Sequence, residues 1–109
     1  MKKTLLGLLF FGATASTVTL AETVFVKYQG PVDLKPFTCT ATASSLVHRI
    51  CYQSEQSYLV VLLDQTYYHY CRMPAQVVTQ WLNADSKGRF YLGNIKGNFD
   101  CRLGGIPNS

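Results

Sequence analysis

The chain has 109 residues, of which 48% are hydrophobic and 15% are charged, so it is long enough for one folded domain and too short for two. Ten Lys and Arg residues against six Asp and Glu residues give a formal charge of +4, and the eight Lys and Arg residues that remain without Lys2 and Lys3 give +2, which favours solubility and a mild preference for anions. The sequence contains no G-x-S-x-G, G-K-[ST] or G-x-G-x-x-G pattern, which excludes the usual signatures of serine hydrolases, P-loop proteins and dinucleotide-binding proteins.

The first 21 residues have the pattern of a secretory signal peptide. Lys2 and Lys3 form a basic start, residues 5–11 are an apolar run, and small residues at Thr19 and Ala21 predict cleavage after Ala21. The alternative is an uncleaved membrane anchor, but a run of this length falls far short of the roughly 20 residues that span a bilayer. We therefore expect a soluble periplasmic or secreted protein with no stable membrane anchor after cleavage.

Residues 22–45 are predicted to form an N-terminal extension. The run "ETVFVKY" alternates like a short strand and is followed by "QGPVD", whose Gly-Pro pair signals a turn. Residues 34–45 show no periodicity and are rich in small polar side chains, so we expect a loop that Cys39 ties down.

Three strands are predicted next, over residues 46–52, 57–63 and 66–71. The connections "QSEQ" and "DQ" are short enough for hairpins, which predicts an antiparallel meander of three to four strands in all. Residues 58–63, "YLVVLL", are apolar on both faces, so this strand should be the central one.

Helices are predicted to follow the strands and to pack on the sheet. In "MPAQVVTQWLNA" Pro74 suits the first helical position, and Val77, Val78, Trp81 and Leu82 form one apolar stripe. The next segment, "DSKGRFYLGNIKG", predicts a short second helix with a serine cap and a buried edge of aromatic and Ile side chains. Residues 102–109 are expected to be a flexible tail, and the whole is expected to be one small α+β fold stapled by disulfides.

All four cysteines follow the predicted cleavage site, and an even number in a small exported chain is typical of disulfides. Cys51 and Cys71 end the first and third strands of the meander at the same end of the sheet. Two strand spacings, about 9.6 Å, separate them unless the strand ends curl together. We expect Cys51–Cys71 and Cys39–Cys101, and the alternative is Cys39–Cys71 with Cys51–Cys101.

The order of several short motifs resembles a known domain. Tyr68 and Tyr70 form a Y-x-Y, Met73-Pro74 opens a helix, A-x-S-x-G begins at Ala84, and an Ile-Lys pair follows, with "HRICY" upstream. Residues 46–99 thereby resemble the KTSC domain, a small module named for its occurrence at the C-terminus of some lysyl-tRNA synthetases and also found alone in bacterial proteins. The resemblance implies a KTSC-like domain over residues 46–101 and suggests RNA binding, but it carries over no catalytic residue and no cofactor.

The tyrosines of "TYYHYC" have two interpretations. In the first, Tyr68 and Tyr70 pack beneath the helix with their hydroxyls hydrogen-bonded at the margin of the sheet. In the second, they form a platform on which nucleic-acid bases stack beside basic side chains. The candidate binding residues are Tyr68, Tyr70, Arg72, Lys87, Arg89 and Lys96.

Thiol and zinc chemistry are weaker alternatives. His69 with Cys71, or His48 with Cys51, would supply a base and a thiol, but an oxidised cysteine is no nucleophile. The cysteine spacings of 12, 20 and 30 residues contain no C-x-x-C pair, so we expect no metal site. The sequence therefore predicts a non-enzymatic, exported module, without a cofactor, that binds a protein or an envelope component; the alternative is the binding of RNA or single-stranded nucleic acid.

Overall fold

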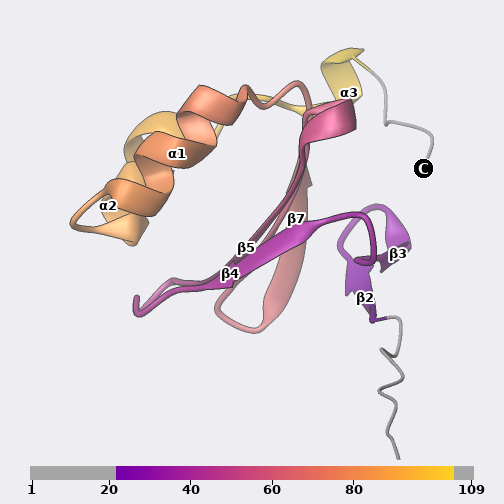
Figure 1. Ribbon diagram of the computed structural model, residues 1–109, viewed down its shortest axis with the longest axis horizontal. Helices are drawn as coiled ribbons and strands as arrows, with labels where there is room; N and C mark the ends of the chain where they lie inside the picture. Colours follow the sequence, from indigo (N-terminus) through magenta and orange to yellow (C-terminus); the bar gives the residue numbers. More distant parts are fainter. Residues whose placement is uncertain (1–21, 105–109) are drawn as a thin grey trace, which may run out of the picture.

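The computed structural model describes residues 22–104, so the predicted leader and residues 105–109 of the predicted tail lie outside the described part. The described chain forms a curled mixed sheet, with α1 and α2 on one side and the short α3 apart from them (Figure 1). Its elements are, in order, β2 (Thr23–Val26), β3 (Gly30–Asp33), β4 (Thr38–Ala41), β5 (Val47–Gln53), a 3-10 turn (Ser54–Gln56), β6 (Tyr58–Leu63), β7 (Thr66–Tyr70), α1 (Ala75–Asn83), α2 (Lys87–Phe90), a π-helical turn (Tyr91–Ile95) and α3 (Cys101–Gly104).

The sheet has the order β3-β2-β7-β6-β5-β4, and β5, β6 and β7 form the predicted antiparallel meander. The predicted number of strands, three to four, was too small, because the N-terminal segment adds β2, β3 and β4 to the three strands of the meander. The β2 strand lies parallel to β7 through the single pair Val26 and Tyr67, which makes the six-stranded sheet mixed.

The β6 strand is central, as its sequence predicted. Leu59 and Val61 on one face, and Val60 on the other, are fully buried. An apolar strand of this kind is stable only when both faces are covered, and here each face has its own hydrophobic cluster.

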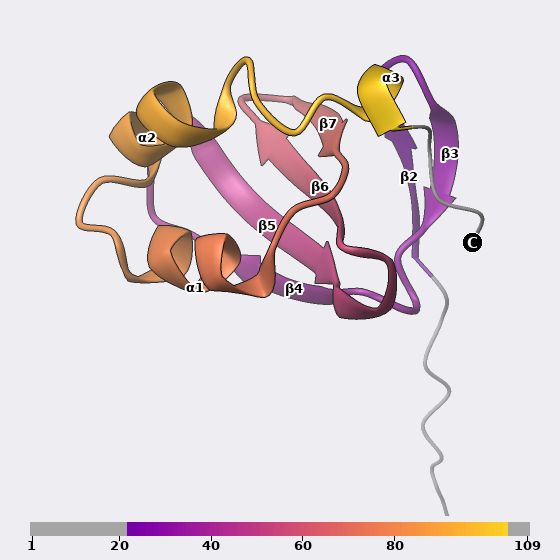
Figure 2. The same cartoon turned by 90° about the horizontal axis from the view of Figure 1, so that it is seen from above.

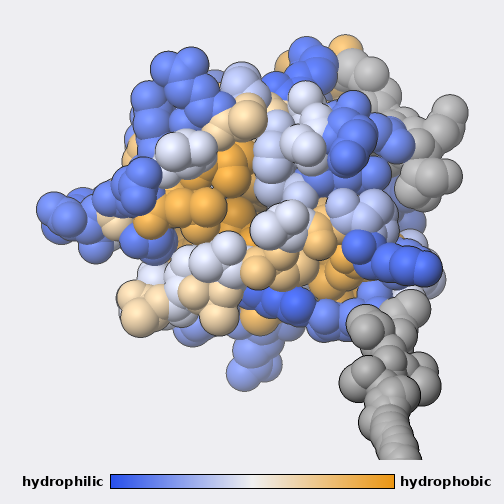
Figure 3. All heavy atoms as spheres, in the orientation of Figure 1, coloured by the Kyte–Doolittle hydropathy of each residue, from blue (hydrophilic) through white to orange (hydrophobic). Residues whose placement is uncertain are grey.

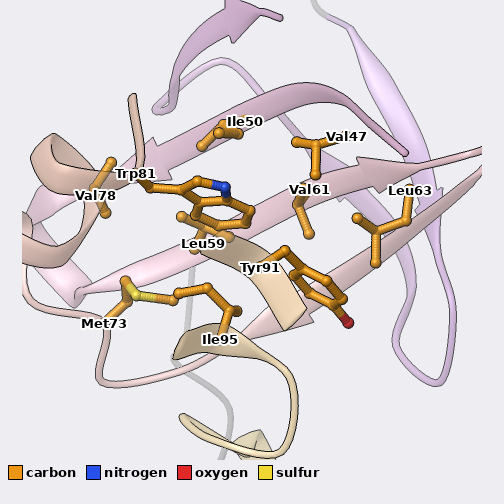
Figure 4. Close-up of a cluster of buried hydrophobic side chains, with 10 residues drawn as sticks. All are labelled: Val47, Ile50, Leu59, Val61, Leu63, Met73, Val78, Trp81, Tyr91 and Ile95. Carbon is orange, nitrogen blue, oxygen red and sulfur yellow. The ribbon is translucent and has the colours of Figure 1, made fainter. Parts of the chain in front are cut away.

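The helices cover the first face. Val78 and Trp81 of α1 are buried, and Tyr91 and Ile95 of the π-helical turn close the same core (Figure 4). Pro74 has an extended ψ of 145° and therefore precedes the helix as its N-cap, one position before the predicted place. The buried members of this first cluster are Val47, Ile50, Leu59, Val61, Leu63, Met73, Val78, Trp81, Tyr91 and Ile95.

Polar contacts hold the second helical segment against the first. The predicted Ser86 cap is confirmed, because its hydroxyl accepts a hydrogen bond from the backbone N–H of Arg89 at 3.1 Å. The Trp81 indole N–H donates to the carbonyl of Lys87 at 3.1 Å. Apolar surface shows between the helices and the sheet, while the outer side of the helices is polar (Figure 3).

The β2–β3 hairpin and α3 cover the second face, on the opposite side of the sheet from α1 and α2 (Figure 2). Val26 and Leu34 are buried there against Tyr58 and Val60. The prediction of a turn at Gly30 and Pro31 is wrong, since these two residues begin β3. Gly30 takes a φ of +99°, which favours glycine. Pro31 is tolerated because β3 is an edge strand.

The predicted loop over residues 34–45 contains the edge strand β4. Its residues pair with β5, and Cys39 lies directly opposite Cys51 with their Cα atoms 4.0 Å apart. The disulfides are therefore Cys39–Cys51 and Cys71–Cys101, and neither the expected pairing nor its alternative occurs.

The physical reason for this correction is the strand that the sequence did not reveal. Pairing of β4 with β5 brings Cys39 to Cys51, while Cys71 follows β7 at the same end of the sheet but is separated from Cys51 by β6. The chain after the π-helical turn returns beside β7, which places Cys101 with its Cα 4.7 Å from that of Cys71. The first turn of the predicted flexible tail is thus helical, in α3. Within residues 22–104 no helix is long and apolar enough to cross a membrane.

Candidate binding cleft

A cleft of about 530 Å³ opens at the outer edge of β7. Residues 68–70 of β7 form its floor, and Lys27 and Tyr28, from the turn between β2 and β3, form one wall. The opposite wall is the segment from Gly97 to Arg102, which passes β7 on its way into α3 (Figure 2). Three distant parts of the sequence thus meet at one strand edge.

The backbone at the floor of the cleft has an open position. The carbonyl of Tyr67 accepts from the N–H of Lys27 at 2.9 Å, and the N–H of Cys71 donates to the carbonyl of Phe99 at 2.8 Å. Alternate residues of a strand direct their backbone groups to the same edge, so those of His69 point to this edge as well. No strand of the described chain pairs with His69 there, because β2 contacts β7 only at Tyr67. The N–H and carbonyl of His69 therefore face the cleft.

Lys27 brings a positive charge to the cleft. Its ammonium lies 5.5 Å from the centroid of the Tyr28 ring and 5.9 Å from that of Tyr68, within the range of cation–π attraction. Among residues 22–104 no carboxylate lies within ion-pair distance of this ammonium. Tyr28 itself is 84% exposed, so its ring is available at the rim.

The other two charged side chains that line the cleft, Asp100 and Arg102, neutralise each other. Arg102 Nη2 lies 2.6 Å from Asp100 Oδ2, and the hydrogen bonds from Arg102 lower the pKa of the Asp100 carboxyl to about 2. Arg72 donates to the backbone carbonyl of Asp100 at 3.0 Å. Among the charged side chains that line the cleft, Lys27 is thus the one without a carboxylate partner, and the nearby Arg72 adds a second positive charge, so the cleft as a whole favours an anionic group.

His69 is held from beneath by Tyr58. The Tyr58 hydroxyl lies 2.9 Å from Nδ1 of the imidazole, and the two rings meet edge to face. Burial lowers the pKa of His69, an effect that the charge of Asp100 partly offsets, and burial raises the pKa of Tyr58 to about 12. The neutral forms of both groups are therefore favoured, and the contact fixes the orientation of the imidazole.

The two tyrosines of the Y-x-Y motif pack against the helical core, and both also line the cleft. The Tyr70 hydroxyl lies 2.6 Å from that of Tyr91, as the packing interpretation predicted for the sheet margin. Burial, followed by this hydrogen bond, raises the pKa of Tyr70. The Tyr68 ring, by contrast, contacts Lys27 at the cleft.

The four basic residues of the predicted nucleic-acid site do not line this cleft. Arg72 is bound to the carbonyl of Asp100 beside it, and the Lys87 ammonium donates to the carbonyl of Ala84 at 2.6 Å. Arg89 lies in α2 and Lys96 follows the π-helical turn, on the helical side of the molecule.

The sequence did not identify the walls of the cleft. Lys27 and Tyr28 lie in a turn, and Asp100 and Arg102 lie beside a cysteine near the chain end, so that only the fold brings them together. All four cysteines are in disulfides, and residues 22–104 contain no group of three His, Cys, Asp or Glu side chains placed to hold a metal ion. The arrangement that remains is a strand edge with aromatic and cationic walls, which is suited to binding a short peptide segment.

Comparison with known proteins agrees with the predicted resemblance. Residues 43–99 match the KTSC domain family. The fold is similar to the crystal structure of a KTSC domain protein from Yersinia pestis, with a TM-score of 0.56 and 31% sequence identity over 58% of this chain and 90% of that chain. No curated protein matches the sequence. From the sequence match over residues 43–99 and the similar fold, we conclude that this chain belongs to the KTSC domain family.

Proposed function

We propose that the protein is an exported, non-enzymatic binding module that takes a short extended segment of a partner protein into the cleft at β7. The observation that carries this proposal is the open backbone position at His69. It lies between two occupied positions of the same strand edge, at Tyr67 and Cys71. A ligand backbone that pairs there would continue the hydrogen bonding of the sheet, which is how many modules recognise extended peptides.

The surroundings of the strand edge support a peptide ligand. Hydrogen bonds to the backbone give affinity without regard to sequence, so specificity must come from side chains. Tyr28, Tyr68 and Tyr70 supply aromatic surface, and Asn98 adds polar contacts at the opposite wall. Aromatic side chains with a polar tip are enriched at protein interfaces for this reason.

Export is part of the proposal. Its support is the signal-peptide pattern of residues 1–21 together with two disulfides, which form and persist in oxidising compartments. A non-enzymatic role is supported by the oxidised state of every cysteine, which removes the one class of nucleophile that the sequence suggested.

The experiment compares two substitutions at the same position. His69→Pro removes the N–H that faces the cleft, while the hydrogen bonds to β6 remain because they use Tyr68 and Tyr70. His69→Ala retains that N–H and serves as the matched control, since both variants lose the contact with Tyr58. A photoreactive amino acid at Tyr28 would report binding in the periplasm, and the same probe at the exposed Leu92 of the π-helical turn would report background.

We expect protein adducts from Tyr28 and not from Leu92, with His69→Pro losing them and His69→Ala retaining them. Circular dichroism would establish that both variants fold. Adducts of equal yield from both folded variants would exclude pairing at the strand edge. Adducts that a nuclease removes would instead support the nucleic-acid alternative.

A further inference from the structure

We propose that the cleft recognises the carboxyl-terminal end of its partner, so that the ligand is a chain terminus with a free carboxylate. This inference rests on the proposed function, since it assumes that a peptide segment pairs at His69. It adds the identity and orientation of that segment, which follow from the length of the open edge and from the charge beside it.

The open edge is too short for a strand that continues in both directions. Its two ends are the occupied backbone positions of Tyr67 and Cys71, four residues apart along β7. At about 3.3 Å per residue this distance is roughly 13 Å. A ligand can pair with His69 alone before it meets the wall at Lys27 on one side or Phe99 on the other. A chain end fits such a gap, because only one of its ends has to leave the cleft.

The charge of the cleft selects which end. An amino terminus would bring a positive charge to Lys27, whereas a carboxyl terminus brings a negative one. The carboxylate of Asp100 does not already fill this role, because it is bound to Arg102. Lys27 is held over the rings of Tyr28 and Tyr68 and is therefore ordered at the cleft.

The aromatic wall indicates the kind of side chain that precedes the carboxylate. With the terminal carboxylate at Lys27, a side chain of the last residues would lie against the rings of Tyr68 and Tyr70, which line the same cleft. These rings are partly buried, and their exposed surface is apolar except at the hydroxyls. An apolar or aromatic side chain near the terminus is the expected preference.

The test uses the full mature protein and a library of random hexapeptides. One half of the library carries a free terminal carboxylate and the other half a terminal amide, with both attached to the support through their amino ends. We expect retention on the carboxylate half to exceed that on the amide half by about tenfold or more, the usual effect of a hydrogen bond to a charged group. Lys27→Gln should abolish the difference, and the matched control Lys96→Gln, outside the cleft, should leave it unchanged.

The outcomes separate the two proposals. Equal retention on carboxylate and amide peptides, with loss of both in His69→Pro, would overturn the carboxylate inference and leave the strand-edge proposal standing. No retention on either half would overturn both. A carboxylate preference that Lys27→Gln leaves unchanged would contradict the role given to Lys27, and with it the inference.

Discussion

Removal of either disulfide should lower the free energy of unfolding, and by different amounts, because the two disulfides close loops of different length. Cys39 and Cys51 are 12 residues apart, whereas Cys71 and Cys101 are 30 residues apart. In the chain-entropy description, these loops correspond to about 2.8 and about 3.6 kcal/mol of stability at 25 °C. The double variant Cys71→Ala with Cys101→Ala should therefore lose about 0.8 kcal/mol more than Cys39→Ala with Cys51→Ala.

Burial of the sulfur atoms acts in the same direction. Cys71 and Cys101 are both buried, with 1% and 4% of their surface exposed, whereas in the other pair Cys51 is buried and Cys39 is only half-buried. Truncation to alanine thus removes more buried surface from the second pair. Urea denaturation of the two variants, followed by fluorescence of Trp81, gives both free energies of unfolding.

The same variants test the cleft. The bond between Cys71 and Cys101 fixes the wall that runs from Gly97 to Arg102, and the other disulfide lies on the far side of the meander. Peptide binding should therefore weaken in the variant that lacks Cys71 and Cys101 and persist in the other. A larger loss of stability or of binding on removal of the disulfide that closes the shorter loop, Cys39–Cys51, would refute this reasoning. A proteolytic digest of the unreduced protein that contains a Cys51–Cys71 peptide would refute it as well.

Three further predictions concern single side chains. Tyr70→Phe should lower the free energy of unfolding by about 1 to 3 kcal/mol in urea denaturation, because it leaves the hydroxyl of Tyr91 without its 2.6 Å partner. The free energy of unfolding should fall as the pH drops below about 6.5, because the pKa of His69 is lower in the folded protein, so that the unfolded chain takes up a proton at a higher pH than the folded one. Thermal unfolding over a series of pH values measures this decrease, and His69→Gln should flatten it. Ser86→Ala should lower the free energy of unfolding by about 1 kcal/mol in urea denaturation, because the helix loses its N-cap hydrogen bond.

Matched controls keep these predictions specific. Tyr68→Phe removes a hydroxyl from the same face of β7 and should lower the free energy of unfolding by less than Tyr70→Phe does. The reverse order would contradict the role given to the hydrogen bond between Tyr70 and Tyr91. Tyr58→Phe retains the imidazole, so the decrease at low pH should persist in it. Ser45→Ala, at an exposed position, should be neutral, and an equal loss there would show that Ser86 is not acting as a cap.

The elements with strong apolar patterns were predictable from the sequence. The run of apolar residues on both faces of 58–63 identified the central strand, and the spacing of Val78 and Trp81 identified α1 with its buried stripe. These patterns are predictive because burial of apolar side chains is the dominant favourable contribution to folding, and the residues that face the core recur with the period of the helix or strand.

The edges of the sheet were not predictable in this way. The β4 segment, "TCTA", has no apolar alternation, and it is a strand because it pairs with β5 and is bonded to it through Cys39. The cleft depends on these edges, since its walls come from a turn near residue 28 and from a segment near residue 100. Local sequence carries no signal for such long-range proximity.

No disulfide cross-links the β2–β3 hairpin to the rest of the protein, because neither disulfide includes a residue from 22–34. One backbone pair to β7, the ion pair of Glu22 with Arg49 and the burial of Val26 and Leu34 are the main contacts that hold it. It is therefore expected to open as a separate unit at a free energy below that of global unfolding. Since Lys27 lies in the turn of this hairpin, opening of the hairpin would move Lys27 away from β7, and a bound ligand that contacts Lys27 would oppose that opening.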